Sequence, residues 1–336
     1  MAVQKGSIRF GLAAEATEGT AVAAPQYVFG LESGGVAVAP AQEPDDLTSG
    51  ARSSSSVFRG DTEVSAEISG RANLASLGML LWGVLGAKTV TGASAPFTHT
   101  FTLADTLPSF TLFQTIVDGA GHDIPRVSGA KVDTLTFEWE GNNPLKVSAS
   151  FRGRALSFGA SGVASILNET GLTTNFIPAG GTFLLDVDSA TPTTAPIRGG
   201  SITLTNNLAP QFYSGNITAG DVDAGWHVAE CAFTTVPADI DEWRTIITGS
   251  AAGAGVATSP VYGSFDHVFR SQGGVGTHQL KVEGLRVAYM CDLPQAQAGG
   301  GAAEVELAGS CLMPTGAGVA PVRFTLVNAT SSYVAA

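Results

Sequence analysis

The sequence predicts a mainly β fold with two tandem, related domains of the β-sandwich or barrel type, each with one short α-helix and a long polar loop. Three observations support this expectation. The composition, with 42 Gly and only 14% charged residues, favours short strands and turns. Apolar and polar residues alternate in many segments, which is typical of strands buried on one face. The order of these segments in the first half of the chain occurs again in the second half.

The elements of the first half follow from their residue patterns. The segment TEVSAEIS at residues 62–69 alternates apolar and polar side chains and predicts a half-buried strand. The apolar spacing at residues 73–86 predicts a short amphipathic helix, in which Asn73 can cap the start and Gly86 the end. Further strands are expected at residues 109–116, 132–140 and 145–155, the last two joined as a hairpin by the Gly-Asn-Asn-Pro turn at residues 141–144.

The second half repeats this series. A strand at residues 227–234 leads into a helix at residues 238–249, which Asp239 or Asp241 can cap. The other matches are residues 264–269 with 109–113, 282–289 with 132–139, 304–312 with the strand from Leu145, and 183–189 with 27–33. Because several elements recur in the same order, we interpret the chain as a tandem duplication.

The duplication sets the expected domain boundaries. The first domain covers residues 1–158 and the second covers residues 159–336, and two copies are too few for a solenoid. Each domain carries one long polar insertion, at residues 39–56 and 206–225. Loops of this length inside compact domains are usually functional or disordered, so both insertions are candidates for a functional role.

Composition and charge exclude several functions. The chain has 17 basic and 29 acidic residues, a net charge of -12, which disfavours binding to the phosphate backbone of nucleic acids. Its three cysteines form no C-x-x-C pair, and we expect them to be reduced and buried. The longest apolar run, residues 74–85, is shorter than the roughly 20 residues that span a bilayer. The opening residues lack the unbroken apolar core of a signal peptide.

Motifs for catalysis or metal binding are not found. Lys88-Thr89 lacks the directly preceding glycine of a phosphate-binding loop, and the five histidines lack zinc-ligand spacing. The carboxylate clusters at residues 45–46, 221–223 and 304–306 lack the spaced oxygen ligands of a calcium loop. We therefore expect a protein that is not an enzyme and has no catalytic, cofactor-binding or metal-binding residues. An enzyme with a site assembled from distant residues stays open as an alternative.

The stretch GLAAEATEGTAVAAP at residues 11–25 contains almost nothing large enough to pack. Its residues resemble the N-terminal signature of one family of phage tail tube proteins, the major tail proteins of long-tailed, non-contractile phages. The residues that carry this resemblance are Gly11, Glu15, Thr17, Gly19, Thr20 and Pro25. The order of elements is similar to that family along nearly the whole chain. We expect this segment to act in assembly, since Gly, Ala and Thr let its backbone approach a neighbouring subunit or ring closely.

The resemblance implies a virion structural protein, synthesised in the host cytoplasm, that forms stacked rings of a hollow tail tube for genome passage into the host. Each tube domain then lends strands to a continuous inner β-barrel. Single-domain members form homohexameric rings, and duplicated members form homotrimers with pseudo-sixfold symmetry. We expect a ring of three chains, with six chains as the alternative. The implied partners are further copies of the chain, other tail proteins at the tube ends, and the tape-measure protein and DNA transiently in the lumen, with no membrane.

The negative charge gives that lumen an expected character. A basic lining would hold DNA, whereas an acidic or neutral lining lets it slide. The expected lining residues are Glu63, Glu67, Glu138, Glu304 and Glu306. The first insertion is the expected contact between successive rings, through Pro44, Asp45, Asp46, Arg52 and Ser55.

A second class of function stays open, which is an adhesive or carbohydrate-binding β-sandwich on a cell surface or a virion. Such a protein is expected to expose clusters of Trp or Tyr in its loops. The four tryptophans mostly fall within expected strands and helices, where core packing explains them.

Overall fold

The computed structural model describes residues 8–44, 56–117, 122–159, 174–187, 192–236, 241–272, 278–292, 304–314 and 320–333. The first half contains β1 (Arg9–Ala14), β2 (Tyr27–Phe29), β3 (Leu31–Pro44), β4 (Val57–Arg71), α1 (Leu77–Leu85), β5 (Gly86–Thr91), β6 (Phe97–Leu103), β7 (Phe110–Val117), β8 (His122–Glu140), β9 (Lys146–Gly153) and β10 (Ala155–Gly159). The second half contains β11 (Phe176–Ile177), β12 (Phe183–Asp186), β13 (Thr193–Thr194), β14 (Ile197–Thr205), β15 (Ala209–Gln211), β16 (Asp221–Asp223), β17 (Val228–Thr235), α3 (Asp241–Thr248), β18 (Tyr262–Ser271), β19 (Gln279–Cys291), β20 (Val305–Cys311) and β21 (Val322–Asn328).

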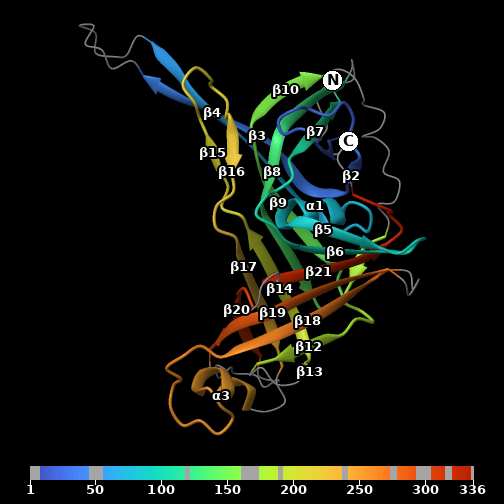
Figure 1. Cartoon of the computed structure of the whole chain (residues 1–336), viewed down its shortest axis with the longest axis vertical. Coiled ribbons are helices and arrows are strands. Elements are labelled where there is room, and N and C mark those ends of the chain that lie inside the picture. The colour runs from blue at the N-terminus through green and yellow to red at the C-terminus, as the bar shows by residue number, and fades with distance from the viewer. Residues whose placement is uncertain are drawn as a thin grey trace, which may run out of the picture.

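The predicted mainly β class is confirmed, and one long antiparallel sheet runs through both halves of the chain (Figure 1). Its strand order is β3-β4-β9-β8-β14-β17-β20-β19, and we call it the long sheet. The two halves join where β8 pairs with β14, with Phe137 opposite Ile202. The long sheet is therefore continuous across the middle of the sequence.

Two strands of the long sheet also take part in a second set of pairings. The first part of β8 pairs with β7 and β10, and β1 lies between β7 and β2. The first part of β19 pairs with β21, and β18 pairs with β19 from Gln279 to Ala288. Strand β21 then pairs with β6 of the first half, which pairs with β5. Among the described residues, two pairings of named strands join the halves, β8 with β14 and β6 with β21.

Alternation along each strand decides which face of the sheet is buried. In β9, the side chains of Val147, Ala149 and Phe151 point into the core, while those between them are more exposed. One cluster of buried side chains includes residues of both halves, from Phe10 to Tyr333. The predicted boundary at residues 158/159 falls at the end of β10, and residues 160–173 lie outside the described residues. The division into two domains stays a prediction.

Helix α1 begins later than the sequence pattern predicts. Ser76 is its N-cap residue, whereas Asn73, the predicted cap, accepts a hydrogen bond from the Ala75 N–H at 2.9 Å. Asn73 therefore caps the turn that leads into the helix, since its carbonyl also accepts from the Leu77 N–H at 3.2 Å, and the regular helix begins only at Leu77. Gly86 ends the helix as predicted, with a φ of 87°. At Gly83 the helix approaches β8 so closely that a Cβ atom would lie 2.5 Å from Val132 Cγ2.

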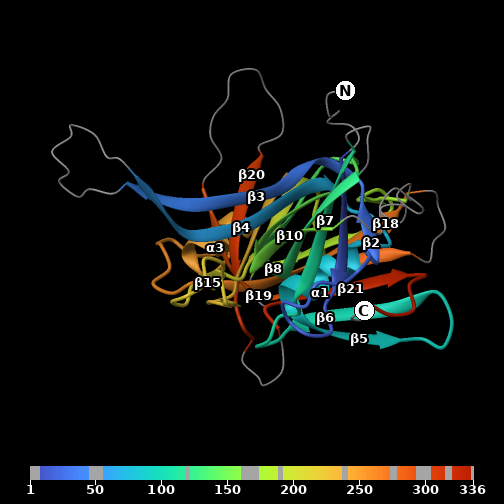
Figure 2. The ribbon, with the colours of Figure 1, turned by 90° about the horizontal axis from the view of Figure 1, so that it is seen from above.

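The two polar insertions are largely strand hairpins in their described parts. Strands β3 and β4 extend as an arm beyond the body of the molecule (Figures 1 and 2). The second insertion contains the β15–β16 hairpin, which lies beside this arm because the Thr62 N–H donates to the Ile217 carbonyl at 2.6 Å. Among the described residues, no helix is long and apolar enough to cross a membrane.

Candidate assembly surfaces

The long sheet has one face turned away from the core, and we call it the polar face. Small hydroxyl side chains dominate it, and the Oγ1 atoms of Thr136 and Thr203 lie 3.3 Å apart where the two halves join. From β4 to β20 in the sheet order, the polar face carries Glu63, Ser65, Glu67, Ser69 and Arg71, then Lys146, Ser148, Ser150 and Arg152, then Thr134, Thr136, Glu138 and Glu140, then Ser201, Thr203 and Thr205, then Glu230, Ala232 and Thr234, and then Glu306, Ala308 and Ser310.

The charged groups of the polar face are mainly acidic. Six carboxylates, at positions 63, 67, 138, 140, 230 and 306, lie beside three basic side chains, Arg71, Lys146 and Arg152. Most other side chains on this face are hydroxyls or small apolar groups. A polyanion that moves along such a surface meets a net negative charge and few cations that could hold a phosphate.

Four of the five predicted lining residues lie on the polar face, and the fifth lies next to it. Glu304 precedes β20, and its Oε1 atom is 2.6 Å from Arg198 Nη1. Together with Glu138 and Glu306 it lines an open hollow of about 830 Å³. Glu63 forms an ion pair with Arg152 across β4 and β9. The structure thus brings the predicted glutamates onto one surface, and their place in a lumen stays a prediction.

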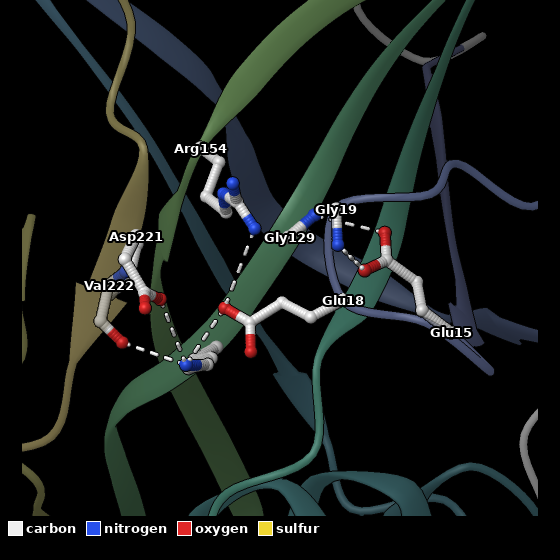
Figure 3. A network of polar contacts seen from close by, with 8 residues as sticks. Glu15, Glu18, Gly19, Gly129, Arg154, Asp221 and Val222 are labelled. Carbon is white, nitrogen blue, oxygen red and sulfur yellow. Dashed lines mark hydrogen bonds and ion pairs between the residues drawn. The ribbon is translucent and has the colours of Figure 1, made fainter.

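The N-terminal segment is anchored within its own chain by Glu15 (Figure 3). The Glu15 carboxylate accepts hydrogen bonds from the Gly129 N–H at 2.9 Å, the Thr111 hydroxyl at 2.8 Å and the Gly19 N–H at 2.8 Å. Its side chain is buried, with a residue exposure of 8%. These bonds satisfy a buried carboxylate, so Glu15 holds the segment against β7 and β8.

Glu18 belongs to a second polar contact that reaches the β15–β16 hairpin. Its Oε1 atom lies 3.0 Å from Lys131 Nζ and 3.9 Å from Arg154 Nη1. Lys131 Nζ also donates to the Val222 carbonyl at 2.8 Å and lies 3.7 Å from the Asp221 carboxylate. Figure 3 shows that Glu18, Arg154 and Asp221 converge from three separate parts of the chain. A hydrogen bond from the Val222 N–H to Asp221 Oδ1 at 2.7 Å lowers the pKa of Asp221, and the charge of Lys131 contributes to this shift.

The other predicted residues of the segment shape its turns. Gly11 lies in β1, where a Cβ atom would meet Pro25 Cβ at 2.7 Å. Thr17 and Thr20 close a turn through a bond from the Thr20 N–H to the Thr17 carbonyl at 3.0 Å. Gly19 has a φ of 77°, which favours glycine. Residues 16–18 and 20–21 are exposed, so a surface for a neighbour remains, and the role of the segment in assembly stays a prediction.

The predicted ring-stacking residues are mostly outside the described part of the chain. Pro44 ends β3 opposite Val57 of β4. Asp45, Asp46, Arg52 and Ser55 lie outside the described residues. Near the end of the described arm, the side chains of Val57 and Phe58 are exposed. Large apolar side chains at the end of an arm are suited to contact with another molecule.

Two residue groups on these surfaces were missed by sequence reasoning. Glu140 and Glu230 share the polar face, and the alternation of Glu230 with buried Ala229 and Cys231 could have identified it. Lys131 was also missed, because its partners Glu18 and Val222 are far away in the sequence. Local patterns carry no information on such long-range contacts.

Buried titratable groups serve packing. Among the described residues, no group of three or more His, Cys, Asp or Glu side chains is placed to hold a metal ion. Burial lowers the pKa of His267 to about 3, and its ring lies among Trp139, Phe183 and Phe269. Cys231 and Cys311 are buried free thiols, and their mutual hydrogen bond, together with burial, raises the pKa of Cys231.

Comparison with known proteins identifies a family. The family model described as "Phage tail tube protein" matches residues 7–245, which is well over half of the chain. The match includes the N-terminal segment, the arm, α1 and the junction of β8 with β14. A search of curated proteins finds no match to this chain.

Proposed function

The chain belongs to the phage tail tube protein family and is a structural component of the virion tail, and we propose that three copies form each ring of the tube, with the polar face of the long sheet lining its lumen. The resemblance expected from the sequence is thereby confirmed, and self-assembly into stacked rings follows from the family. The number of chains per ring, the lining of the lumen and the passage of the genome are the parts that we propose.

The observation that carries the proposal is the continuous long sheet with its polar face. A closed ring of such sheets forms a barrel, which leaves no strand edge exposed to aggregation. The core side of the sheet is covered by the rest of the chain, whereas the polar face carries hydroxyls and carboxylates on the strands from β4 to β20 in the sheet order. This arrangement favours a water-filled bore inside the sheet and the bulk of the chain outside it.

Three chains per ring are supported by the matching order of pairings in the two halves. The run β3-β4-β9-β8 corresponds to the run β14-β17-β20-β19, and a helix follows the second strand of each run, α1 after β4 and α3 after β17. The end of β8 pairs with β14, the first strand of the second run. A further copy can repeat this junction by pairing its β3 with the end of β19.

In the described residues, no strand pairs with the edges that this junction needs, although the Val36 N–H of β3 donates to Gln114 Oε1 at 2.7 Å. Strand β3 pairs with β4 on one edge only. At the end of β19, Met290 and Cys291 pair with β20 and have no strand on their other side. Head-to-tail pairing of these edges is a heterologous contact, which closes into a ring when the rotation fits.

The acidic character of the polar face gives the tube a mechanism for genome passage. DNA carries about one negative charge per 1.7 Å of duplex axis, so a basic lining would bind it and slow its movement. The carboxylates of the polar face repel the phosphates, and the hydroxyls between them keep the wall hydrated. We infer that the lumen works as a conduit with low affinity for DNA.

Electron microscopy and native mass measurement of the purified chain test this proposal together. We expect hollow rings or tubes, and isolated rings with the mass of three chains. Rings with six chains would contradict the proposal that each half of the chain fills one of six positions in the ring. A protein that stays monomeric under all conditions would contradict the proposal as a whole.

One observation favours the second class of function. The Trp226 side chain is 84% exposed, beside the exposed Met313, and exposed indole rings can stack on sugars. Trp139 and Trp243 are buried in the core, as the sequence predicts. Binding of labelled oligosaccharides to the wild type, and its loss in Trp226→Ala, would support an adhesive protein in addition to a tube.

A further inference from the structure

Strands β10 and β21 occupy corresponding places in the two halves. Each pairs with the first part of a long strand, β10 with β8 and β21 with β19. Their surroundings differ in the described residues, because the second edge of β21 pairs with β6, whereas β10 pairs with β8 alone.

The inward side of β21 is fully buried, in part against the first half of the chain. Val322, Phe324 and Leu326 are completely buried, and the Phe324 ring lies 5.4 Å from that of Phe137 in β8. Just beyond the strand, Tyr333 packs directly on Gly78 of α1, where a Cβ atom would lie 2.2 Å from the ring. The helix and strands of the first half thus form the seat of β21.

The corresponding side of β10 is left open. Leu156 packs against the core, and Phe158, two residues later, projects from the same side of the strand. The Phe158 side chain is 69% exposed. A phenylalanine exposed on a strand whose counterpart is fully buried indicates a surface that another molecule covers.

An apolar groove lies beside the helix of the second half, where the seat of β21 has its counterpart. It has a volume of about 530 Å³, and its lining includes Ile247 of α3, Val256 and Val261 of the following turn, and Tyr289 and Cys291 of β19. Val256 is 79% exposed. The groove therefore combines an apolar lining with an accessible opening.

The positions of these two surfaces suit contact between two copies of the chain. Figure 1 shows β10 near one end of the long axis and α3 near the opposite end, so one chain does not bring them together. Within the chain, the seat beside α1 binds β21 of the other half. Because α3 corresponds to α1 and β10 to β21, the groove beside α3 corresponds to a seat for β10 of the next chain.

We propose that Phe158 of one copy inserts into the groove between α3 and the end of β19 of the next copy, a contact that rests on the proposed ring. This proposed contact differs from the corresponding contact inside the chain, which β21 makes with the first half. The first half offers the β5–β6 hairpin, whose β6 pairs with β21, whereas residues 249–261 after α3 contain no strand. At this place an inserted aromatic side chain of the neighbouring copy therefore replaces the pairing of β6 with β21, in addition to the proposed pairing of β3 with the end of β19.

Substitution of Phe158 is the first test, with a matched control on the same strand. Ser157 is also exposed but points to the opposite side of β10. We expect Phe158→Asp to raise the protein concentration for half-maximal ring formation by roughly tenfold or more, and Ser157→Asp to leave it nearly unchanged. Far-UV circular dichroism and the thermal midpoint check that both variants fold.

Cysteine cross-linking provides a second test, which does not depend on weakening the ring. In a Cys291→Ser background, Phe158→Cys is combined with Val256→Cys. Assembled rings are then treated with diamide. The two thiols lose two electrons and two protons to form one disulfide, and diamide is reduced by accepting them. We expect covalent oligomers of whole chains on a denaturing gel, and none from the Ser157→Cys, Val256→Cys pair. Rings that form normally but give no cross-link, with Phe158→Asp equal to its control, would overturn this inference and leave the tube function standing. If the wild type forms no rings at all, both proposals fall.

Discussion

The carboxylate of Glu15 accepts a hydrogen bond from the backbone N–H of Gly129 at 2.9 Å, although 114 residues separate them in the sequence. This bond and those from Thr111 and Gly19 show what a segment with almost no large side chains packs against. A buried charge with several donors takes the place of a hydrophobic contact.

We expect Glu15→Ala to lower the free energy of unfolding by about 2 to 4 kcal/mol, because it leaves several buried donors without an acceptor. Glu18 lies in the same segment, but its side chain is 35% exposed, so Glu18→Gln should cost less than about 1 kcal/mol. Urea unfolding of the two variants measures the difference. Equal losses would show that the segment is held by some other contact.

A second prediction concerns the C-terminal residues, which hold the helix of the first half. Tyr333 is completely buried, its hydroxyl donates to the Ala75 carbonyl at 3.2 Å, and it accepts from Asn328 Nδ2 at 2.7 Å. We expect Tyr333→Ala to cost roughly 3 to 5 kcal/mol through the cavity, and Tyr333→Phe about 1 to 2 kcal/mol through lost hydrogen bonds. Urea unfolding curves give both values. If Tyr333→Ala were neutral, the C-terminal residues would not contribute to the shared core.

Features that depend on neighbouring residues in the sequence could be predicted, whereas contacts between distant residues could not. The alternation around Val64 and Ile68 placed β4 correctly, and the same alternation placed Glu67 on the polar face, because strand periodicity fixes both faces at once. The pairing of β8 with β14 has no local signal, since it depends on two strands that lie about 65 residues apart. The partners of Glu15 were hidden for the same reason.

The helix start shows a different limit of sequence reasoning. Asn73 is a good capping residue, but its side chain is used in the turn before α1, and Ser76 takes the cap position without a capping hydrogen bond from its side chain. Packing of the helix on β8 at Gly83 and on Tyr333 at Gly78 sets where the helix can lie. The local preference of Asn73 thus acts on the turn before the helix, and the regular helix starts at Leu77.

The buried His267 predicts a dependence of stability on pH. Burial lowers its pKa to about 3, so the folded protein leaves it neutral while the unfolded chain binds a proton below about pH 6.5. The unfolded state then binds more protons, and stability falls by up to about 1.4 kcal/mol per pH unit as the pH drops from 6 towards 3. We expect His267→Phe to abolish this part of the dependence and to keep the ring contacts with Trp139 and Phe269. Urea unfolding at pH 7 and pH 4.5 measures this change in the free energy of unfolding. Equal decreases in the wild type and the variant would contradict its assignment to His267.

The ring-stacking arm gives a fourth prediction. Replacing residues 44–55 by Asn-Gly keeps Glu43 opposite Phe58, closes β3 and β4 with a four-residue loop and leaves the core untouched. We expect a folded chain that makes rings or stays monomeric but does not form tubes, because a contact between successive rings is lost. Electron microscopy of the variant beside the wild type checks this, together with an unchanged thermal midpoint. Tubes of normal length would refute a role of this insertion in stacking.

The acidic polar face gives a final prediction about DNA. Glu67 and Glu306 are exposed on this face, on β4 and β20. We expect tubes of the double variant Glu67→Lys, Glu306→Lys to retain short duplex DNA at low salt and to release it as salt rises, with a slope of about -0.9 per phosphate contact in a plot of log affinity against log salt. Asp105→Lys is the matched control, because Asp105 is exposed in the loop between β6 and β7 and does not belong to the polar face. Retention by the double variant alone would place the polar face in the bore, since DNA inside the tube reaches only its lining. Equal retention by the control and the double variant would mean that DNA binds the outer wall, and the polar face would then lose its assignment as the lumen.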